Sequence, residues 1–252
     1  MFNWLSPFGA AIKATELPML AASFDGSPPR TRTSSQLGGR PWWPAGMAYP
    51  VDREGRPLML LAQLNFADMP RLAPFPDAGL LQIFIGRDDL YGCTFCDTNG
   101  GDEFACVFHH DTAAPAAIPV DPAFDPPNNY SPLDRPLEAI ALTFSLSRMP
   151  VDPTDYRLSK LLPKLFNDEN KLEAYQNGLQ TPPIRLGGYP SFTQEDARSY
   201  NEPGGIGDFN LLTVDTADGI MWGDSGVAQF FMHEDDLRRR DFSKVRYNWD
   251  CC

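Results

Sequence analysis

Short apolar runs bounded by glycine, proline and aspartate recur along the chain and predict β-strands. Two such runs cover residues 59–65 and 210–215, and two more cover residues 80–86 and 227–233. They are rich in Leu, Ile, Val and Phe, which is typical of strands. Their nearly continuous apolar character indicates strands that are covered on both faces. Residues 137–144 form a further predicted strand.

The spacing of the apolar positions changes after residue 152. Leucine and phenylalanine then recur at intervals of three and four residues, at Leu158, Leu161, Leu162, Leu165 and Phe166. This spacing predicts a helical face. Pro163 interrupts it, so we expect two short helices. Gly178 is a predicted helix end, and Thr193 is a predicted helix start because its hydroxyl can cap the acidic turn that follows.

Three sequence patterns from the first half of the chain return in the same order in the second half. The paired segments are 37–41 with 186–190, 64–68 with 214–218, and 79–85 with 226–232. Their offsets are 149, 150 and 147 residues, so they agree to within small insertions. Each half has too few predicted strands to close a core alone. We therefore expect a single domain over residues 1–252 that contains two pseudo-repeats, at about residues 34–110 and 183–243.

Composition favours a turn-rich globular protein. The chain has 252 residues, of which 42% are hydrophobic, enough for a proper core. It contains 25 prolines, roughly double the usual share of about 5%, so a helical bundle is not expected.

The net charge of −12 limits the classes of partner. A general nucleic-acid binder needs a basic face that displaces counterions from phosphates, so nucleic acid is not expected. Anionic lipid is disfavoured for the same reason. No apolar run approaches the ~18–20 residues of a membrane span. An acidic surface is compatible with a basic protein partner.

The five cysteines indicate reduced thiols and a cytoplasmic location, because the number is odd and a chain of this length needs no disulfides. Cys93, Cys96, Cys106 and His110 are the types of residue that bind zinc in tetrahedral sites. Cys106 and His110 would share one face of a strand, whereas Cys106 and His109 would not. Three interpretations stay open: a zinc site, redox activity, and ordinary packed or surface thiols. No other cofactor is predicted.

The stretch from Met221 to Leu237 brings Asp224, Ser225 and His233 close together in the sequence. It lacks the Gly-x-Ser-x-Gly elbow, and adjacent residues rarely converge on a third group. The repeat instead favours a turn that feeds a core strand. The sequence also has no P-loop, Rossmann glycine motif or His-Glu-x-x-His, so no catalytic residue is predicted.

Aromatic residues beside turns rich in proline and glycine predict an exposed binding surface, because aromatic anchors dominate many interfaces. The predicted binding residues are Trp42, Trp43, Tyr49, Gln63, Trp222 and Asp224. The alternative is that the aromatic rings plug the ends of the sheet structure.

A basic cluster stands out in this acidic chain, formed by Arg238–Arg240 with Lys244 and Arg246. It can hold an acidic partner or a phosphate. It can also be a solvated run that pairs with neighbouring carboxylates at residues 234–236.

Several of these motifs together resemble the YwqG-like family, bacterial proteins with a domain of unknown function. The motifs are 37–39, 49–50, 55–58, 61–64 and 79–84 in the first half, and 186–190, 215, 222–224 and 241–243 in the second. The resemblance implies an α+β fold, mainly an antiparallel, barrel-like or sandwich sheet built from an internal pseudo-repeat, with a few short helices. It supplies no mechanism.

We therefore expect a non-enzymatic module that binds a protein or another ligand. Similar proteins occur near bacterial toxin–immunity systems, so a toxin is one candidate for a basic partner. The alternatives are an uncharacterised hydrolase and a zinc-stabilised structural protein.

Overall fold

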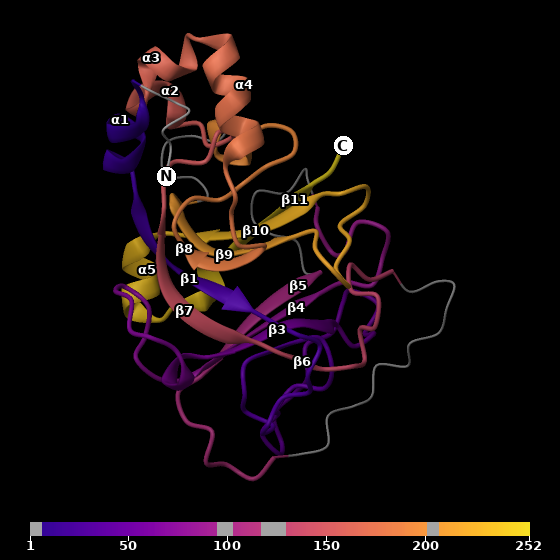
Figure 1. Cartoon of the computed structure of the whole chain (residues 1–252). Coiled ribbons are helices and arrows are strands. Elements are labelled where there is room, and N and C mark those ends of the chain that lie inside the picture. The colour runs from indigo at the N-terminus through magenta and orange to yellow at the C-terminus, as the bar shows by residue number, and fades with distance from the viewer. Residues whose placement is uncertain (1–6, 95–102, 117–129, 201–206) are drawn as a thin grey trace.

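The computed structural model describes residues 7–94, 103–116, 130–200 and 207–252. These residues form eleven strands in two antiparallel sheets, which lie one above the other (Figure 1). The expectation of a mainly antiparallel α+β fold with a few short helices is confirmed. The described residues form a sandwich of two sheets and not a closed barrel.

The first sheet has five strands in the order β5-β4-β3-β2-β6. They are β2 (Gln36–Leu37), β3 (Met59–Asn65), β4 (Leu80–Ile85), β5 (Phe104–His109) and β6 (Ile140–Ala141). All residues of β4 and all but the last of β3 are buried. This confirms that these strands are covered on both faces.

The second sheet has six strands in the order β11-β10-β9-β8-β1-β7. They are β1 (Leu17–Ser23), β7 (Thr143–Met149), β8 (Ile184–Gly187), β9 (Phe209–Asp215), β10 (Val227–Met232) and β11 (Arg246–Asp250). From β8 to β11 the chain order and the spatial order agree, as they do from β2 to β5 in the first sheet.

One stretch of chain connects the two sheets along one side. β6 pairs with β2 of the first sheet, and β7 pairs with β1 of the second. Between them, the Leu142 N–H donates to the Ser35 carbonyl at 2.9 Å, outside both ladders. The single strand predicted at residues 137–144 is therefore wrong in extent, because the chain changes sheets at Leu142 and continues to Met149.

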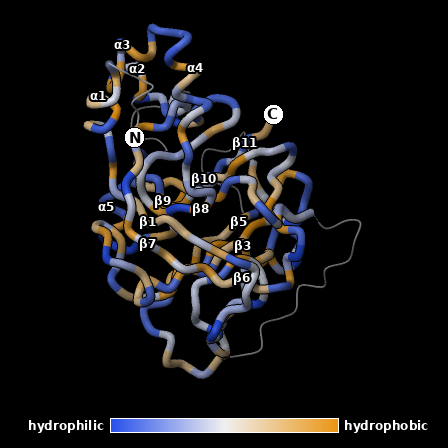
Figure 2. The backbone as a smooth tube through the Cα atoms, viewed as in Figure 1, coloured by the Kyte–Doolittle hydropathy of each residue, from blue (hydrophilic) through white to orange (hydrophobic). Residues whose placement is uncertain are grey.

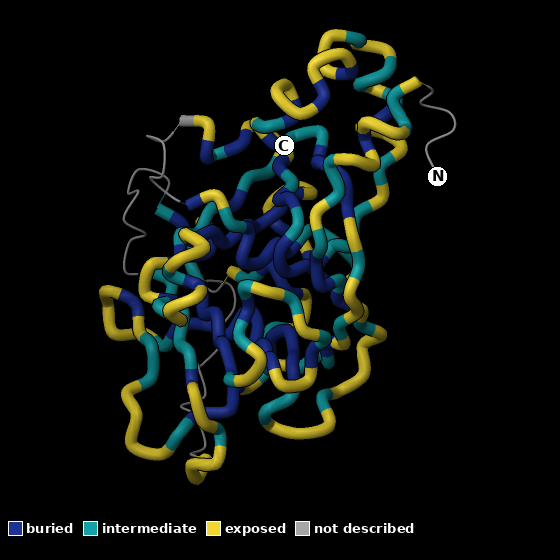
Figure 3. Tube along the Cα trace, turned by 90° about the vertical axis from the view of Figure 1, so that its left-hand side faces the viewer, coloured by how far each residue is buried: buried dark blue, intermediate teal, exposed yellow. Residues whose placement is uncertain are grey.

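The main hydrophobic core fills the space between the sheets. Both sheets contribute to it, with Leu61, Leu81 and Ile83 from the first and Leu212, Phe230 and Trp249 from the second. Apolar residues are concentrated on the strands (Figure 2), and buried residues occupy the middle of the molecule (Figure 3). Burial of apolar surface stabilises a protein by about 25 cal/mol per Å², so this layer dominates the stability of the fold.

The α-helices are α1 (Gly9–Ala14), α2 (Leu158–Leu161), α3 (Pro163–Phe166), α4 (Glu169–Gly178) and α5 (Glu234–Arg239). Four of the described α-helices, α1 to α4, gather at one end of the second sheet, and α5 lies apart from them (Figure 1). The 3-10 helices are η2 (Phe66–Asp68), η3 (Ala197–Tyr200) and η4 (Phe242–Lys244). The predicted break at Pro163 and the predicted end at Gly178 are confirmed. Among the described residues, no helix has the length and apolar character needed to span a bilayer.

The predicted helix start at Thr193 is wrong. The N–H and hydroxyl of Thr193 and the N–H of Gln194 donate to one carboxylate oxygen of Asp250, at 2.6–3.0 Å. These bonds hold the segment against β11, so helical backbone begins only at η3, which is a 3-10 helix.

Buried polar side chains lie on the face of each sheet that points away from the main core. In the first sheet, Gln63 accepts the Trp42 N–H at 2.9 Å and Gln82 donates to the Trp42 carbonyl at 2.5 Å. In the second sheet, Gln229 donates to the Ser191 carbonyl at 2.7 Å. A buried amide without a partner costs about 1–3 kcal/mol. These bonds therefore fix the two segments that cover the outer faces.

Each covering segment follows a Gly-Gly turn with left-handed backbone. The φ angles are +55° and +69° at Gly38 and Gly39, and +73° and +66° at Gly187 and Gly188. Glycine adopts such angles without strain. At Gly39 the approach of the chain is also close, because a Cβ there would overlap the Cβ of Ala139.

Substitution of Gly39 tests this packing. Gly39→Ala should lower the free energy of unfolding by about 3 kcal/mol or more, because left-handed strain of about 1–2 kcal/mol adds to steric overlap. Gly46→Ala is the matched control, since Gly46 has φ +83° and a Cβ added there would meet no atom within 4 Å. It should cost only the strain. Urea unfolding measures both, and equal losses would contradict the close approach.

Candidate functional site

The three tryptophans of the predicted binding surface are buried. Trp42, Trp43 and Trp222 expose 4%, 3% and 0% of their surface, so the expectation that they are exposed is wrong. The Trp43 ring lies edge-on to Phe84, with centroids 5.8 Å apart, and the half-buried Tyr49 tilts against it at 5.1 Å. These rings cover the outer face of the first sheet, where Phe84 would otherwise meet water.

Gln63 is buried as well, and its amide is satisfied within the chain. Its nitrogen donates to the carbonyls of Arg32 and Ser34 at 2.9 and 2.8 Å. Its oxygen accepts from the Trp42 N–H and from Gln82, both at 2.9 Å. Gln63 thus organises the fold and leaves no polar group for a ligand.

His109 belongs to the same buried group. Its Nε2 lies 2.9 Å from the side-chain oxygen of Gln82. The rings of Trp42 and Trp43 meet it edge-on, at centroid distances of 5.1 and 5.5 Å. Burial lowers the pKa of His109 and favours the neutral ring.

The stretch around Trp222 forms a tight turn before β10. The Gly226 N–H donates to the Trp222 carbonyl at 2.7 Å, and Gly223 and Ser225 have positive φ. Asp224 lies exposed at the tip. The Nε1 N–H of Trp222 is buried and has no hydrogen-bond partner among the described residues.

The predicted zinc ligands are only partly within the described residues. Cys93 is buried, and burial raises the pKa of its thiol to about 12. Burial also raises the pKa of Cys106, while His110 is exposed. Cys96 lies outside the described residues. Within the described part of the chain, no three His, Cys, Asp or Glu side chains form a group that could hold a metal ion.

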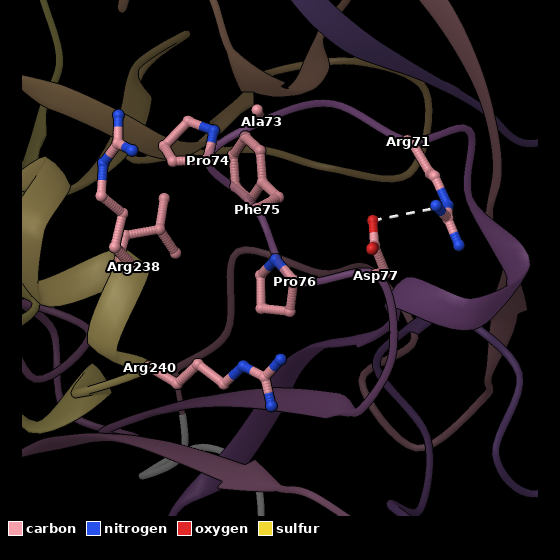
Figure 4. Close-up of a pocket in the computed structure, with 9 residues that line it drawn as sticks. Arg71, Ala73, Pro74, Phe75, Pro76, Asp77, Arg238 and Arg240 are labelled. Carbon is pink, nitrogen blue, oxygen red and sulfur yellow. Dashed lines mark ion pairs between the residues drawn. The ribbon is translucent and has the colours of Figure 1, made fainter.

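A pocket of about 390 Å³ opens elsewhere, between the loop at residues 71–77 and the end of α5 (Figure 4). We call it the arginine pocket. It is lined by Arg71, by residues 73–77, and by Leu237, Arg238 and Arg240. In Figure 4 the Pro74-Phe75-Pro76 strip lies between Arg71 on one side and Arg238 and Arg240 on the other.

Local packing positions both walls of the arginine pocket. Phe75 is buried against Phe66 and Phe209, with ring centroids 6.0 and 5.3 Å away, so the proline-flanked loop is held on the core. Leu237 is fully buried and holds α5 in the same way. Arg240 ends α5 with a left-handed φ of +60°.

The three arginines differ in how they are paired. The Arg71 Nε lies 3.5 Å from an oxygen of Asp77, and both side chains are largely exposed. Arg238 forms an ion pair with Glu234 on the same helix. Arg240 has no carboxylate partner among the described residues. The arginine pocket therefore has one unpaired guanidinium and one that is weakly paired.

A second hollow, of about 350 Å³, shares Ala73 with the arginine pocket. We call it the glycine-turn groove, because Gly187 and Gly188 line it. Its other walls are Leu17, Pro18, Leu72, Arg157, residues 208–210 and residues 233–234.

The fold and the pocket together define a two-sheet sandwich protein with an arginine-lined pocket. The sequence profile of a family described as a domain of unknown function (DUF1963) matches residues 35–251, and the chain therefore belongs to that family. The match spans both Gly-Gly turns. No curated protein matches the chain. The resemblance is thus confirmed as far as a domain of unknown function, and the YwqG-like assignment stays a prediction.

Sequence reasoning noticed the basic cluster but missed the loop that faces it. Arg238 and Arg240 belong to the predicted cluster, whereas residues 71–77 carried no signal beyond their prolines. The two segments are far apart in the sequence, so only packing of Phe75 on the core brings them together.

Substitution of Trp222 tests its role in the core. Trp222→Ala should lower the free energy of unfolding by about 3–5 kcal/mol through cavity formation. Trp222→Phe should change it by only about 1 kcal/mol, because the lost volume is offset by removal of an unsatisfied donor. Chemical denaturation measures both. A Phe variant as unstable as the Ala variant would show that the indole N–H has a partner.

The buried His109 predicts a pH-dependent stability. A pKa lowered by folding means that the unfolded chain binds the proton more readily, so stability is lost as pH falls below about 6.5. Between pH 7 and 5 the slope should reach at most about 1.4 kcal/mol per pH unit. The difference in unfolding free energy between the wild type and His109→Gln isolates this contribution. A pH-independent difference would contradict the burial of a neutral ring.

Proposed function

We propose that this protein is a non-enzymatic binding module whose arginine pocket holds an anionic group of its ligand. The observation that carries the proposal is the set of guanidinium groups around an apolar floor, in a chain whose net charge is −12. This local positive charge attracts an anion, whereas the negative charge of the rest of the protein repels one.

The chemistry of the walls suits a carboxylate or a phosphate. A guanidinium is planar and presents five donors, so it binds both anions through paired hydrogen bonds. Arg240 is available without loss of an existing ion pair among the described residues. The separation of 3.5 Å between Arg71 and Asp77 exceeds the ~2.7–2.9 Å of a strong charge-assisted bond. An exposed pair of this kind contributes little, so a ligand can displace Asp77.

The floor adds an apolar requirement. Pro74, Phe75 and Pro76 separate the arginines in Figure 4, and Leu237 also lines the pocket. A ligand that carries an aromatic or aliphatic group beside its anion gains contact here, whereas a bare inorganic anion does not. Binding pockets commonly combine apolar walls with a few placed polar groups.

We also infer that the sandwich arose by internal duplication of residues 34–110 and 183–243. The strand order β5-β4-β3-β2 repeats as β11-β10-β9-β8. Gln36, Gln63 and Gln82 lie side by side across the first sheet, and Arg185, Thr213 and Gln229 do so across the second. Taken in the order given, each residue of the second set follows its counterpart in the first by 149, 150 and 147 positions. These are the same offsets as between the repeated sequence patterns. Equivalent glutamines, Gln82 and Gln229, bind the backbone after the equivalent turns.

The setting of this module is part of the proposal. The described cysteines are all free thiols, which supports a reducing, cytoplasmic location. The overall acidity supports a basic protein as the wider partner, of which a toxin is one example. A bacterial, YwqG-like origin fits the motifs of the sequence.

Phenyl phosphate is a suitable probe of the arginine pocket, because it joins an anion to an apolar ring. Calorimetry at constant ionic strength should show saturable binding to the wild type. Arg240→Gln should weaken it about tenfold, equivalent to about 1.4 kcal/mol. Arg239→Gln is the matched control, because Arg239 lies on the same helix, pairs with Asp236 and does not line the pocket. It should leave the affinity nearly unchanged.

Two results would contradict the proposal. One is the absence of saturable binding to the wild type. The other is an equal loss in both variants, which would show only a general response to net charge.

A further inference from the structure

β7 forms one border of the second sheet, and its outer edge has no partner among the described residues. It pairs with β1 from Thr143 to Met149 without any shift of register. Outside this ladder, no hydrogen bond from the described part of the chain reaches the backbone of β7. In an antiparallel pair every second residue directs its N–H and C=O away from the partner strand. β7 therefore presents a row of backbone groups that another strand can bind.

β7 also extends the second sheet beyond the first. The two sheets end on the same side, because the chain passes from β6 directly into β7 at Leu142. The first sheet ends there with β2 and β6, whereas the second continues from β8 and β1 to β7. Among the described strands, β7 has no counterpart in the first sheet. Its inner face therefore lies at the open side of the sandwich.

Leu146 lies on this inner face and is uncovered. It pairs with Leu20 of β1, which belongs to the main core, so both side chains point to the same side of the sheet. Leu20 is 1% exposed, whereas Leu146 is 56% exposed, more than any other large hydrophobic residue in the described ranges. A strand added beside β7 would continue the sheet and cover this side chain.

The sequence of β7, TFSLSRM, is complementary to a second copy of itself. When two copies pair in antiparallel fashion about Leu146, this residue meets its own counterpart. Ser145 then meets Ser147, and Phe144 meets Arg148. Opposed residues point to the same face, so the two Leu146 side chains contact each other. Such pairing has the twofold symmetry that is common in homodimers.

The charges of β7 permit two copies to meet. The strand contains no acidic residue. Its one charged residue, Arg148, donates to the Glu16 carbonyl at 2.7 Å, and its Nε lies 3.5 Å from the Glu16 carboxylate. A net charge of −12 opposes contact between copies at acidic surfaces. β7 also lacks the lysine, proline or bulge that commonly protects an edge strand from association.

We propose that two copies of this chain associate through β7, so that their second sheets form one continuous antiparallel sheet with Leu146 at the twofold axis. This goes beyond the proposed function, because no residue of β7 lines the arginine pocket. The dimer carries two arginine pockets, one in each copy.

Sedimentation equilibrium of the full chain, in the presence of a reductant, tests the association. The mass should rise reversibly with protein concentration from 28.0 kDa toward twice that value. Leu146→Lys should weaken the dimer at least about tenfold, because it places like charges directly opposite each other. Leu137→Lys is the matched control, since Leu137 is 46% exposed and lies outside β7. It should leave the association unchanged.

Leu146→Cys locates the axis. Opposed residues of an antiparallel pair have Cα atoms about 4.5–5.5 Å apart, within the range of about 4.4–6.8 Å that a disulfide spans. With oxidised glutathione as oxidant, this variant should form a covalent dimer, and Leu137→Cys should not. Both variants carry Cys252→Ser, which removes the exposed natural thiol.

Three outcomes would overturn the proposal. They are a wild type that stays monomeric up to about 100 µM, a dimer that withstands Leu146→Lys, and equal crosslinking of the two cysteine variants. A circular dichroism spectrum of Leu146→Lys that matches the wild type shows that its fold is intact. Phenyl phosphate should bind each chain of this variant as in the wild type, so failure of the dimer and failure of the arginine pocket can be told apart.

Discussion

The structure depends on one arrangement that occurs in each sheet, a Gly-Gly turn followed by a segment whose backbone is bound by buried side-chain amides. Gln63 and Gln82 bind both backbone groups of Trp42, and Gln229 binds the carbonyl of Ser191. A buried amide without hydrogen-bond partners destabilises the folded state. These bonds therefore hold each covering segment in one position. Both faces of each sheet are then covered at its centre, which is why the central strands β3, β4, β9 and β10 are buried almost throughout.

Much of the fold could be predicted from the sequence, and the errors have physical causes. Strands β3, β4, β9 and β10 were evident from their apolar runs, and Pro163 marked the break between α2 and α3. The change of sheet at Leu142 had no local signal, because it depends on pairing with strands elsewhere. The helix start at Thr193 failed because Asp250, far along the chain, accepts the bonds that a helix cap would use. The tryptophans were expected at the surface since a sequence does not show which turn is covered.

The candidate site was harder to predict because it is formed by arginines in a chain whose overall charge is negative. A chain with a net charge of −12 gives no sign of a pocket lined by arginines. The arginine pocket has the opposite sign and arises only where Phe75 and Leu237 place two distant segments face to face. The two hollows share Ala73.

Side-chain NMR can test the claim that the arginine pocket binds an anion beside an apolar group. If the pocket binds this ligand, the Nε–H signals of Arg71 and Arg240 should shift along one saturable curve as phenyl phosphate is added. Signals of remote arginines such as Arg135 and Arg148 should stay in place at constant ionic strength. Equal shifts at all four arginines, or an unmoved Arg240 signal, would contradict the claim.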